Sequence, residues 1–237
     1  MCIFEWVGGF FHKLPLAARL KQLFDMEDLK TVPNDKNEEL WNKDLLILIN
    51  SKIKKEFPKY KAIKGKVLKD IFLHKDKNLK YSLQFGFVDQ DIIIYDETMD
   101  ISDLQKSSNI LIHKNTTDDK GTLIIPKLIC ELKYNGINSH GLVIYSDYAA
   151  DIKAIFPDCK YFLALRFKRS STPNKLFRHG KNFDKIIAFD NGRPKGSYVA
   201  NDFLSQIKVD KDLKGKFEEF IEEIKNVLRI KKSHFIK

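Results

Sequence analysis

The stretch Leu128–Tyr134 (LICELKY) sets an acid and a base inside an otherwise apolar, strand-like run. Side chains alternate across a β-strand, so Glu131 and Lys133 share one face while Cys130 and Leu132 share the other. Burying either charge without a partner is costly in free energy. The strand is therefore expected to form the wall of a cleft, where the two charges meet a metal ion or an anionic ligand.

A hard cation such as Mg²⁺ takes oxygen ligands and would need a second acid beside Glu131. The segment VDQDIIIYD supplies Asp91 at the head of an apolar strand. Asp118 and Asp119 lie closer to Glu131 in sequence and are the alternative first acid. Asp91 is favoured because a strand holds a ligand more rigidly than a loop rich in Thr, Asp, Lys and Gly.

Around these segments the apolar residues follow helical or strand periods. The patterns predict helices at 14–30, 38–57, 141–156 and 217–228, strands between 60 and 96 with turns at Gly65 and 74–78, and strands at 122–134, 160–167 and 185–190. One α/β domain is the simplest interpretation. In it, residues 1–35 are a helical extension, 36–190 the catalytic core and 191–237 a C-terminal helical element.

An acid opening an apolar strand, followed by an apolar strand ending in Glu-x-Lys, resembles the PD-(D/E)XK nuclease superfamily. The matching order of elements covers residues 38–167. Gln90 stands where the motif's name has proline, and the separation of Asp91 and Glu131 (131 − 91 = 40) is longer than in compact members. The resemblance implies a restriction-endonuclease-like core, a central mixed β-sheet flanked by helices, with extra helices at both termini.

The resemblance also implies that Asp91, Glu131 and Lys133 are catalytic. Asp91 and Glu131 would hold Mg²⁺, with Mn²⁺ as a substitute, and the backbone carbonyl of Ile129 or Cys130 would be a further ligand. Lys133 would orient or deprotonate the attacking water, or stabilise the charge that develops on the phosphate.

In this superfamily the first core helix often contributes another acid, and Glu39 is the candidate. It lies seven residues before Leu46, on the helical face that carries Ile49 and Ile53. The alternative is that Glu39 only complements the helix dipole.

Residues 168–181 form the most basic stretch, which is expected to be a loop. The side chains that suit contacts to phosphates and base edges are Lys168, Arg169, Lys175, Arg178 and Lys181. A solvated surface loop is the alternative. The net charge of +10 points to an anionic partner, of which nucleic acid is the commonest, although charge also serves solubility.

These features together predict a Mg²⁺-dependent endonuclease for double-stranded DNA, most simply a type II restriction enzyme of a restriction system. A resolvase, a repair or mobile-element nuclease of the same fold, and a non-catalytic DNA-binding module remain alternatives. A homodimer would bring two sites to the two strands. The wide apolar stripe of the C-terminal helix offers a face for that contact.

Three cysteines without metal or disulfide spacing indicate a reducing compartment, and the cytoplasm is the expected location. No run approaches the ~18 consecutive apolar residues of a membrane span. We therefore expect no membrane partner.

Overall fold

The computed structural model describes residues 34–75, 77–98, 124–168, 172–192, 199 and 201–230. The chain divides into two compact units, Met1–Lys36 and Asn37–Lys237, and nearly all described residues belong to the second. The helix expected at 14–30 and the alternative acids Asp118 and Asp119 lie outside the described residues.

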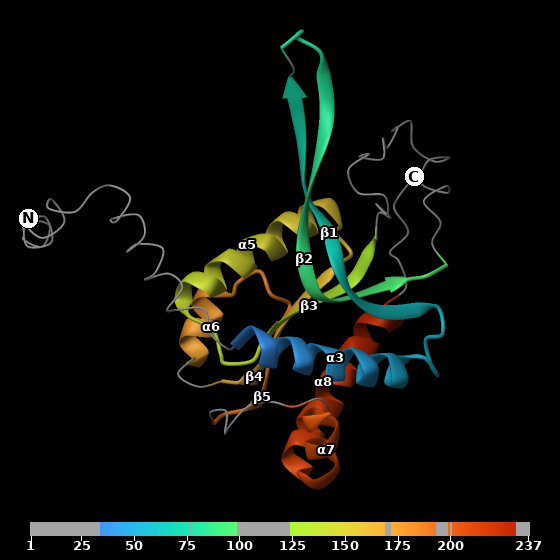
Figure 1. The fold of residues 1–237 in the computed structure, drawn as a ribbon, viewed down its shortest axis with the longest axis vertical. Helices are drawn as coiled ribbons and strands as arrows, with labels where there is room; N and C mark the ends of the chain where they lie inside the picture. Colours follow the sequence, from blue (N-terminus) through green and yellow to red (C-terminus); the bar gives the residue numbers. More distant parts are fainter. Residues whose placement is uncertain are drawn as a thin grey trace, which may run out of the picture. The chain divides into compact units, whose positions relative to one another are not determined.

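A five-stranded mixed sheet, in the order β1-β2-β3-β4-β5, lies at the centre of the described part (Figure 1). The strands are β1 (Tyr60–Lys75), β2 (Tyr81–Asp96), β3 (Pro126–Lys133), β4 (Lys160–Phe167) and β5 (Lys185–Asp190). The first two pairings are antiparallel and the last two are parallel. Parallel neighbours need crossover connections, which hold α5 (Ser139–Ile155) and α6 (Pro173–His179).

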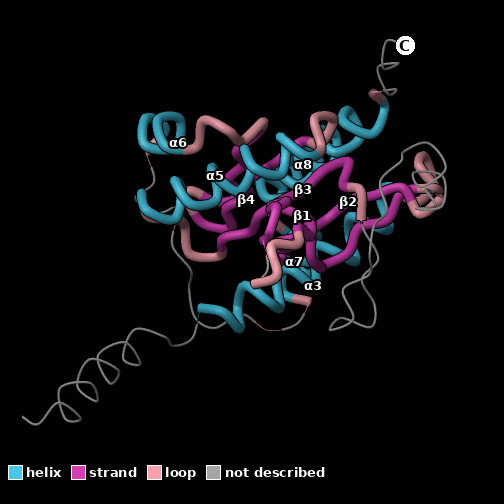
Figure 2. Tube along the Cα trace, turned by 90° about the horizontal axis from the view of Figure 1, so that it is seen from above, coloured by secondary structure: helices cyan, strands magenta, loops and turns pink. Residues whose placement is uncertain are grey.

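Helices lie on either side of the strands (Figure 2). One core cluster joins the sheet to α3 (Asn34–Ile53), α7 (Asp202–Val209) and α8 (Lys211–Arg229), and a second cluster joins it to α5 and α6. The alternation of β3 divides its side chains between the two: Cys130 and Leu132 enter the first cluster and Ile129 the second. This arrangement confirms the expected α/β fold with a mixed sheet flanked by helices, and is consistent with a restriction-endonuclease-like core. None of the described helices has the length and apolar character needed to cross a membrane.

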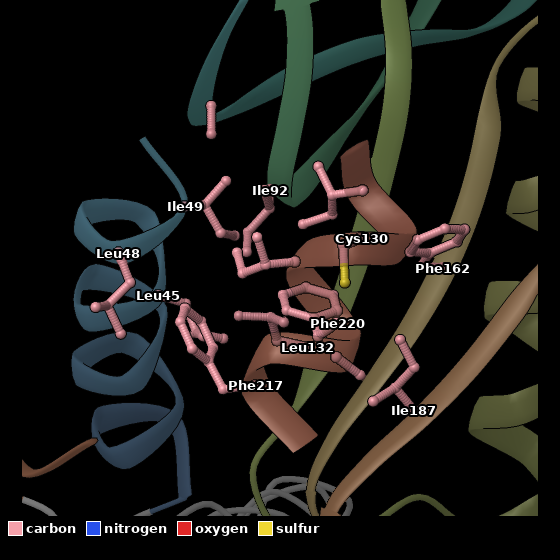
Figure 3. Packing of buried hydrophobic residues seen from close by; sticks show 14 of the residues in the cluster. Leu45, Leu48, Ile49, Ile92, Cys130, Leu132, Phe162, Ile187, Phe217 and Phe220 are labelled. Carbon is pink, nitrogen blue, oxygen red and sulfur yellow. The ribbon is translucent and has the colours of Figure 1, made fainter. Parts of the chain in front are cut away.

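The apolar stripe of α8 is buried inside the domain and is not a free dimer face. Phe217 and Phe220 pack with Leu45 and Ile49 of α3 and with Cys130 of β3 (Figure 3). The expectation that this helix supplies a dimer contact is therefore wrong. Its stripe is wide because the helix packs against both the sheet and its helical neighbours.

Two local expectations from the sequence are also corrected. β1 continues through Gly65 without a turn. Gly65 lies instead beside a bulge, where the register between β1 and β2 shifts. The stretch expected to be a basic loop contains α6, which Thr172 caps by accepting from the backbone N of Lys175, with Pro173 in the first turn. Threonine followed by proline is a helix start signal.

The first turn of α7 depends on a carboxylate from α3. Its N-cap residue, Asn201, has φ 66° and makes no side-chain capping bond. Asp44, buried on α3, accepts instead from the backbone N of Asn201 at 3.1 Å and of Phe203 at 3.2 Å.

We expect Asp44→Ala to lower the free energy of unfolding by about 1–3 kcal/mol, because two backbone N–H groups, one of them on the buried Phe203, lose their acceptor. Chemical denaturation measures the change. The exposed Asp147 of α5 is the control, and its replacement by alanine should cost less than about 0.5 kcal/mol. Equal losses in the two variants would contradict the capping role.

Candidate active site

The sheet forks at Asp91. β2 pairs with β3 only between Ile92 and Tyr95, whereas it pairs with β1 along its whole length. At the fork, Ile63 pairs with Ile93 and Gly65 pairs with Gln90, so β2 carries one extra residue there. Such bulges end strand pairing and re-aim side chains. The bulge thus places Asp91 where β2 leaves β3.

The carboxylate of Asp91 is bound to the backbone of the strand that holds the other predicted residues. Its Oδ2 accepts a hydrogen bond of 2.9 Å from the backbone N of Leu132, which lies between Glu131 and Lys133. Asn42 of α3 donates through Nδ2 to the Asp91 carbonyl at 3.0 Å and to Oδ1 at 3.4 Å. The structure therefore brings Asp91 to Glu131 and Lys133, although 40 positions separate the two acids (131 − 91).

The ammonium of Lys133 lies between two carboxylates. Its Nζ is 3.0 Å from Oε1 of Glu131 and 3.0 Å from Oε1 of Glu38, which extends from α3. The other oxygen of Glu38 accepts from the backbone N of Tyr134 at 3.0 Å. Four charged side chains from α3, β2 and β3 thus form one cluster, named here the fork cluster: Glu38, Asp91, Glu131 and Lys133.

Burial sets the electrostatics of the fork cluster. Glu131 is 4% exposed, and this desolvation raises the pKa of its carboxyl to about 8, against the attraction of Lys133 and with a further rise from the charge of Asp91. Burial lowers the pKa of Lys133, but the carboxylates of Glu131 and Glu38 outweigh it, so that the pKa of the ammonium is raised. Lys133 is thus held as a cation, which suits charge stabilisation and the orientation of water more than proton abstraction.

Aromatic and amide groups complete the surroundings. Lys133 Nζ lies 4.7 Å from the ring centre of Tyr145 on α5. Burial raises the pKa of the Tyr145 hydroxyl, and the charge of Glu131 adds to this rise. Tyr161 of β4 donates from its hydroxyl to Oε1 of the buried Gln90 at 2.6 Å. Sequence reasoning missed these residues and Asn42, since nothing in a single sequence brings α5 and β4 to the fork.

The acid that α3 supplies is Glu38, not Glu39. Glu39 is half-exposed and makes an ion pair of 2.8 Å with Lys43, one turn further along the helix. The expectation placed Glu39 on one face with Leu46, Ile49 and Ile53, but Leu46 is only partly buried, whereas its neighbour Leu45 is fully buried. This shift of one residue turns Glu39 towards solvent. The spacing of Glu38 and Asn42 by four residues is the signal that would have found the correct face.

Cys130 places its side chain in the core, where burial, followed by the charges of Asp91 and Glu131, raises the pKa of its thiol. Its backbone is the last rung of the β2–β3 ladder, opposite Ile92. The carbonyl expected as a metal ligand therefore belongs to the residue beside the fork.

The carboxylates at the fork suit a Mg²⁺ ion that takes few ligands from the protein. Within the described ranges, no group of three or more His, Cys, Asp or Glu side chains could hold a metal ion. Mg²⁺ commonly takes one or two carboxylates and keeps several waters, and Asp91 and Glu131 supply that number. The residues therefore fit Mg²⁺.

The predicted DNA contacts have different environments. Arg169 lies outside the described residues, and Lys168 is half-buried. Lys175 donates from Nζ to the backbone carbonyl of Ile137 at 3.1 Å, which ties α6 to the loop before α5. Arg178 and Lys181 are exposed and remain predicted DNA contacts.

The fold and the fork cluster define a mixed-sheet α/β domain with acids and a lysine gathered at the end of the central strands. No family model and no curated protein matches the chain. Among solved structures, one chain of the native BbvCI A2B2 tetramer, determined at low resolution, aligns with a TM-score of 0.37 and 13% identity. The alignment covers 69% of this chain and 59% of that chain. A likeness this distant shows nothing about activity.

Proposed function

We propose that this protein is a Mg²⁺-dependent endonuclease that hydrolyses phosphodiester bonds in double-stranded DNA. The observation that carries the proposal is the hydrogen bond from the backbone N of Leu132 to Asp91 Oδ2. It joins an acid on one strand to the residue between an acid and a lysine on the next strand. Phosphodiester hydrolysis needs such a group of acids and a cation around one phosphate.

Each residue of the fork cluster has a distinct part in this proposal. Asp91 and Glu131 would hold Mg²⁺, or Mn²⁺ in its place, beside the carbonyl of Cys130. The bound metal supplies Lewis acidity and a water of lowered pKa. Lys133 offers a fixed positive charge for the oxygen atoms of the phosphate, where charge increases in the transition state. Glu38 holds that ammonium, and Asn42 holds Asp91.

The charge of the chain supports DNA as the partner. The net charge is +10, and the exposed Arg178 and Lys181 lie on α6 and just after it. Among nucleases we propose a type II restriction enzyme acting in the cytoplasm. Cleavage of plain plasmid DNA at fixed positions supports that role. Preference for junctions or single strands would identify a resolvase or a repair or mobile-element nuclease instead.

Nicking of supercoiled DNA tests the fork cluster. We expect wild type to cut unmethylated plasmid and phage DNA with Mg²⁺ or Mn²⁺ and not with EDTA. Asp91→Asn and Glu131→Gln should each lose about 10²–10³-fold or more in rate, because each removes one metal-binding charge. Glu38→Gln should lose about 10–100-fold, because it acts through Lys133.

Glu39→Gln is the matched control, since it makes the same change on the neighbouring residue and should leave the rate unchanged. Equal rates in all these variants would remove the proposed site. DNA binding by wild type without any cleavage would identify the chain as a non-catalytic DNA-binding module.

A further inference from the structure

A long two-stranded arm extends from the fork. In the part of β2 that precedes Asp91, the pairings among described residues are with β1 alone, and their register continues from Lys66–Asp89 to Lys75–Tyr81. Figure 1 shows this hairpin reaching away from the rest of the sheet. The arm is defined here as 66–75 with 81–89. At about 3.3 Å per residue, its ten-residue strand spans roughly 33 Å.

The register sorts the side chains of the arm onto two faces. An extra residue on β1, Lys69, separates the pair Leu68–Phe87 from the pair Ile71–Phe85 and keeps both on one face. The same face continues through Leu73 to Tyr81, beside which Lys75 Nζ lies 5.4 Å from the ring centre. This apolar arm face consists of Leu68, Ile71, Leu73, Tyr81, Phe85 and Phe87.

The opposite face is mixed. It carries Asp70, Phe72 and His74, and a Cβ built at Gly86 would lie 3.1 Å from Cβ of Asp70 and 3.3 Å from Phe72 Cε2. Among the described residues, a helix contacts the base of the arm, where Lys69 lies against Tyr148 and Asp151 of α5. Apolar residues are therefore concentrated on one side of the arm.

The outer part of the apolar arm face is exposed to solvent, whereas Leu68 at its base is buried. Leu73 is 66% exposed, Tyr81 61%, Ile71 51% and Phe87 48%. A lone two-stranded hairpin is marginally stable in water and requires a packed apolar face. Large apolar patches on otherwise polar proteins mark contact sites. The arm thus calls for a partner that is itself apolar.

We propose that the apolar arm face packs against the same face of a second copy of this chain. A two-fold axis brings one patch onto itself, so an apolar face meets an equally apolar face. Side chains of this size, at these exposures, leave roughly 500 Å² per chain to be covered. Two copies together bury about 1,000 Å², the lower bound of a specific interface. DNA is a poorer match, because its grooves offer an apolar side chain little beyond the thymine methyl group.

The association of two copies does not depend on the nuclease activity, but it would affect how that activity reaches the two strands of DNA. The described residues contain one fork cluster, and a duplex has two strands to cut. Asp91 follows the arm on β2 after Gln90, so a contact between arms connects the fork clusters of two copies through the paired strands β1 and β2. The dimer contact then lies on the β1–β2 arm and not on the C-terminal helix, which the sequence had suggested.

Sedimentation velocity without DNA or metal tests this interface. We expect wild type to form dimers at micromolar concentration and to retain them in 0.5 M salt, since an apolar contact is not screened. Ile71→Thr and Leu73→Thr keep strand propensity and add no charge. We expect each to raise the dissociation constant at least tenfold, and the double variant at least 100-fold, with unchanged far-UV circular dichroism.

Ile47→Thr is the matched control, because Ile47 is 58% exposed on α3 and should leave the dimer intact. Wild type that stays monomeric at 100 µM overturns the proposal, as does a dimer that the arm variants leave unaffected or that salt dissociates. A monomeric wild type whose arm variants lose DNA affinity assigns the arm to DNA and also overturns it. Dimers without nicking activity contradict only the proposed function, and nicking by a monomer contradicts only this interface.

Discussion

Lys133→Met is expected to lower the free energy of unfolding by about 3 kcal/mol and to abolish cleavage. The substitution leaves Glu131, which is 4% exposed, and Glu38 without the ammonium that lies 3.0 Å from each of them. Removing one partner of a buried ion pair costs about 3–5 kcal/mol, and the partial exposure of Glu38 places the effect at the lower end. Guanidinium denaturation in EDTA at pH 9, where the Glu131 carboxyl with its pKa of about 8 is ionised, measures the stability, and plasmid nicking measures the activity.

A double variant shows whether the loss comes from the orphaned charge. Glu131→Gln combined with Lys133→Met should recover about 1–3 kcal/mol relative to the sum of the single changes, without restoring cleavage. Lys43→Met is the control, since it breaks the exposed pair with Glu39 and should cost less than about 1 kcal/mol. Strictly additive losses, or an equal loss in the control, would mean that Lys133 is not the counter-ion of Glu131.

The metal-free protein should lose stability as pH rises, through Glu131. The pKa of this carboxyl is about 8 in the folded chain against 4.5 as its ordinary value. The folded state therefore binds this proton more tightly than the unfolded state. The resulting contribution to the free energy of unfolding is fully present below pH 4.5 and is lost as pH rises through 8. We expect wild type to lose about 4 kcal/mol relative to Glu131→Gln, which does not titrate, between pH 4 and pH 9. Denaturation of both proteins in EDTA across this range measures the difference.

Mg²⁺ should reverse that loss. The cation binds the ionised carboxylates, so at pH 8–9 it should stabilise wild type by about 2–3 kcal/mol at 100 times its dissociation constant. Glu131→Gln should gain much less, because only Asp91 remains charged. Equal stabilisation of the two proteins by Mg²⁺ would exclude Glu131 as a ligand, and a flat pH profile would exclude its raised pKa.

The site was partly readable from sequence. Asp91 opens an apolar strand and Glu131 and Lys133 share one face of another, so local patterns were enough to select the three residues that the fork brings together. Glu38 was missed because the buried face of α3 is rotated by one residue from the face that Leu46 suggested. A helix with apolar residues on several sides does not reveal its inward face until it is packed.

For the arm, the sequence predicted the local structure in part but not the pairing of its strands. Its two strands and the turn between them were predicted, yet Gly65 was taken as a second turn. Bulges at the fork and at Lys69 depend on which residues of β1 and β2 pair, and pairing is a property of two strands together. The apolar arm face exists only in that register, because a slip of one residue would turn its side chains to the other side.

By itself, the sequence determined the α/β class, the order of the five strands and of α3, α5 and α8, and the side of β3 on which Glu131 and Lys133 lie. These follow from local periods, since the side-chain direction in a strand or helix depends on near neighbours. Only the tertiary structure decided that α3 contributes Glu38, that Asp91 reaches Leu132 at a fork, and that α8 is buried while the arm is open. Those features need contacts between segments distant in sequence, where burial and charge pairing select one arrangement among many that satisfy the same local pattern.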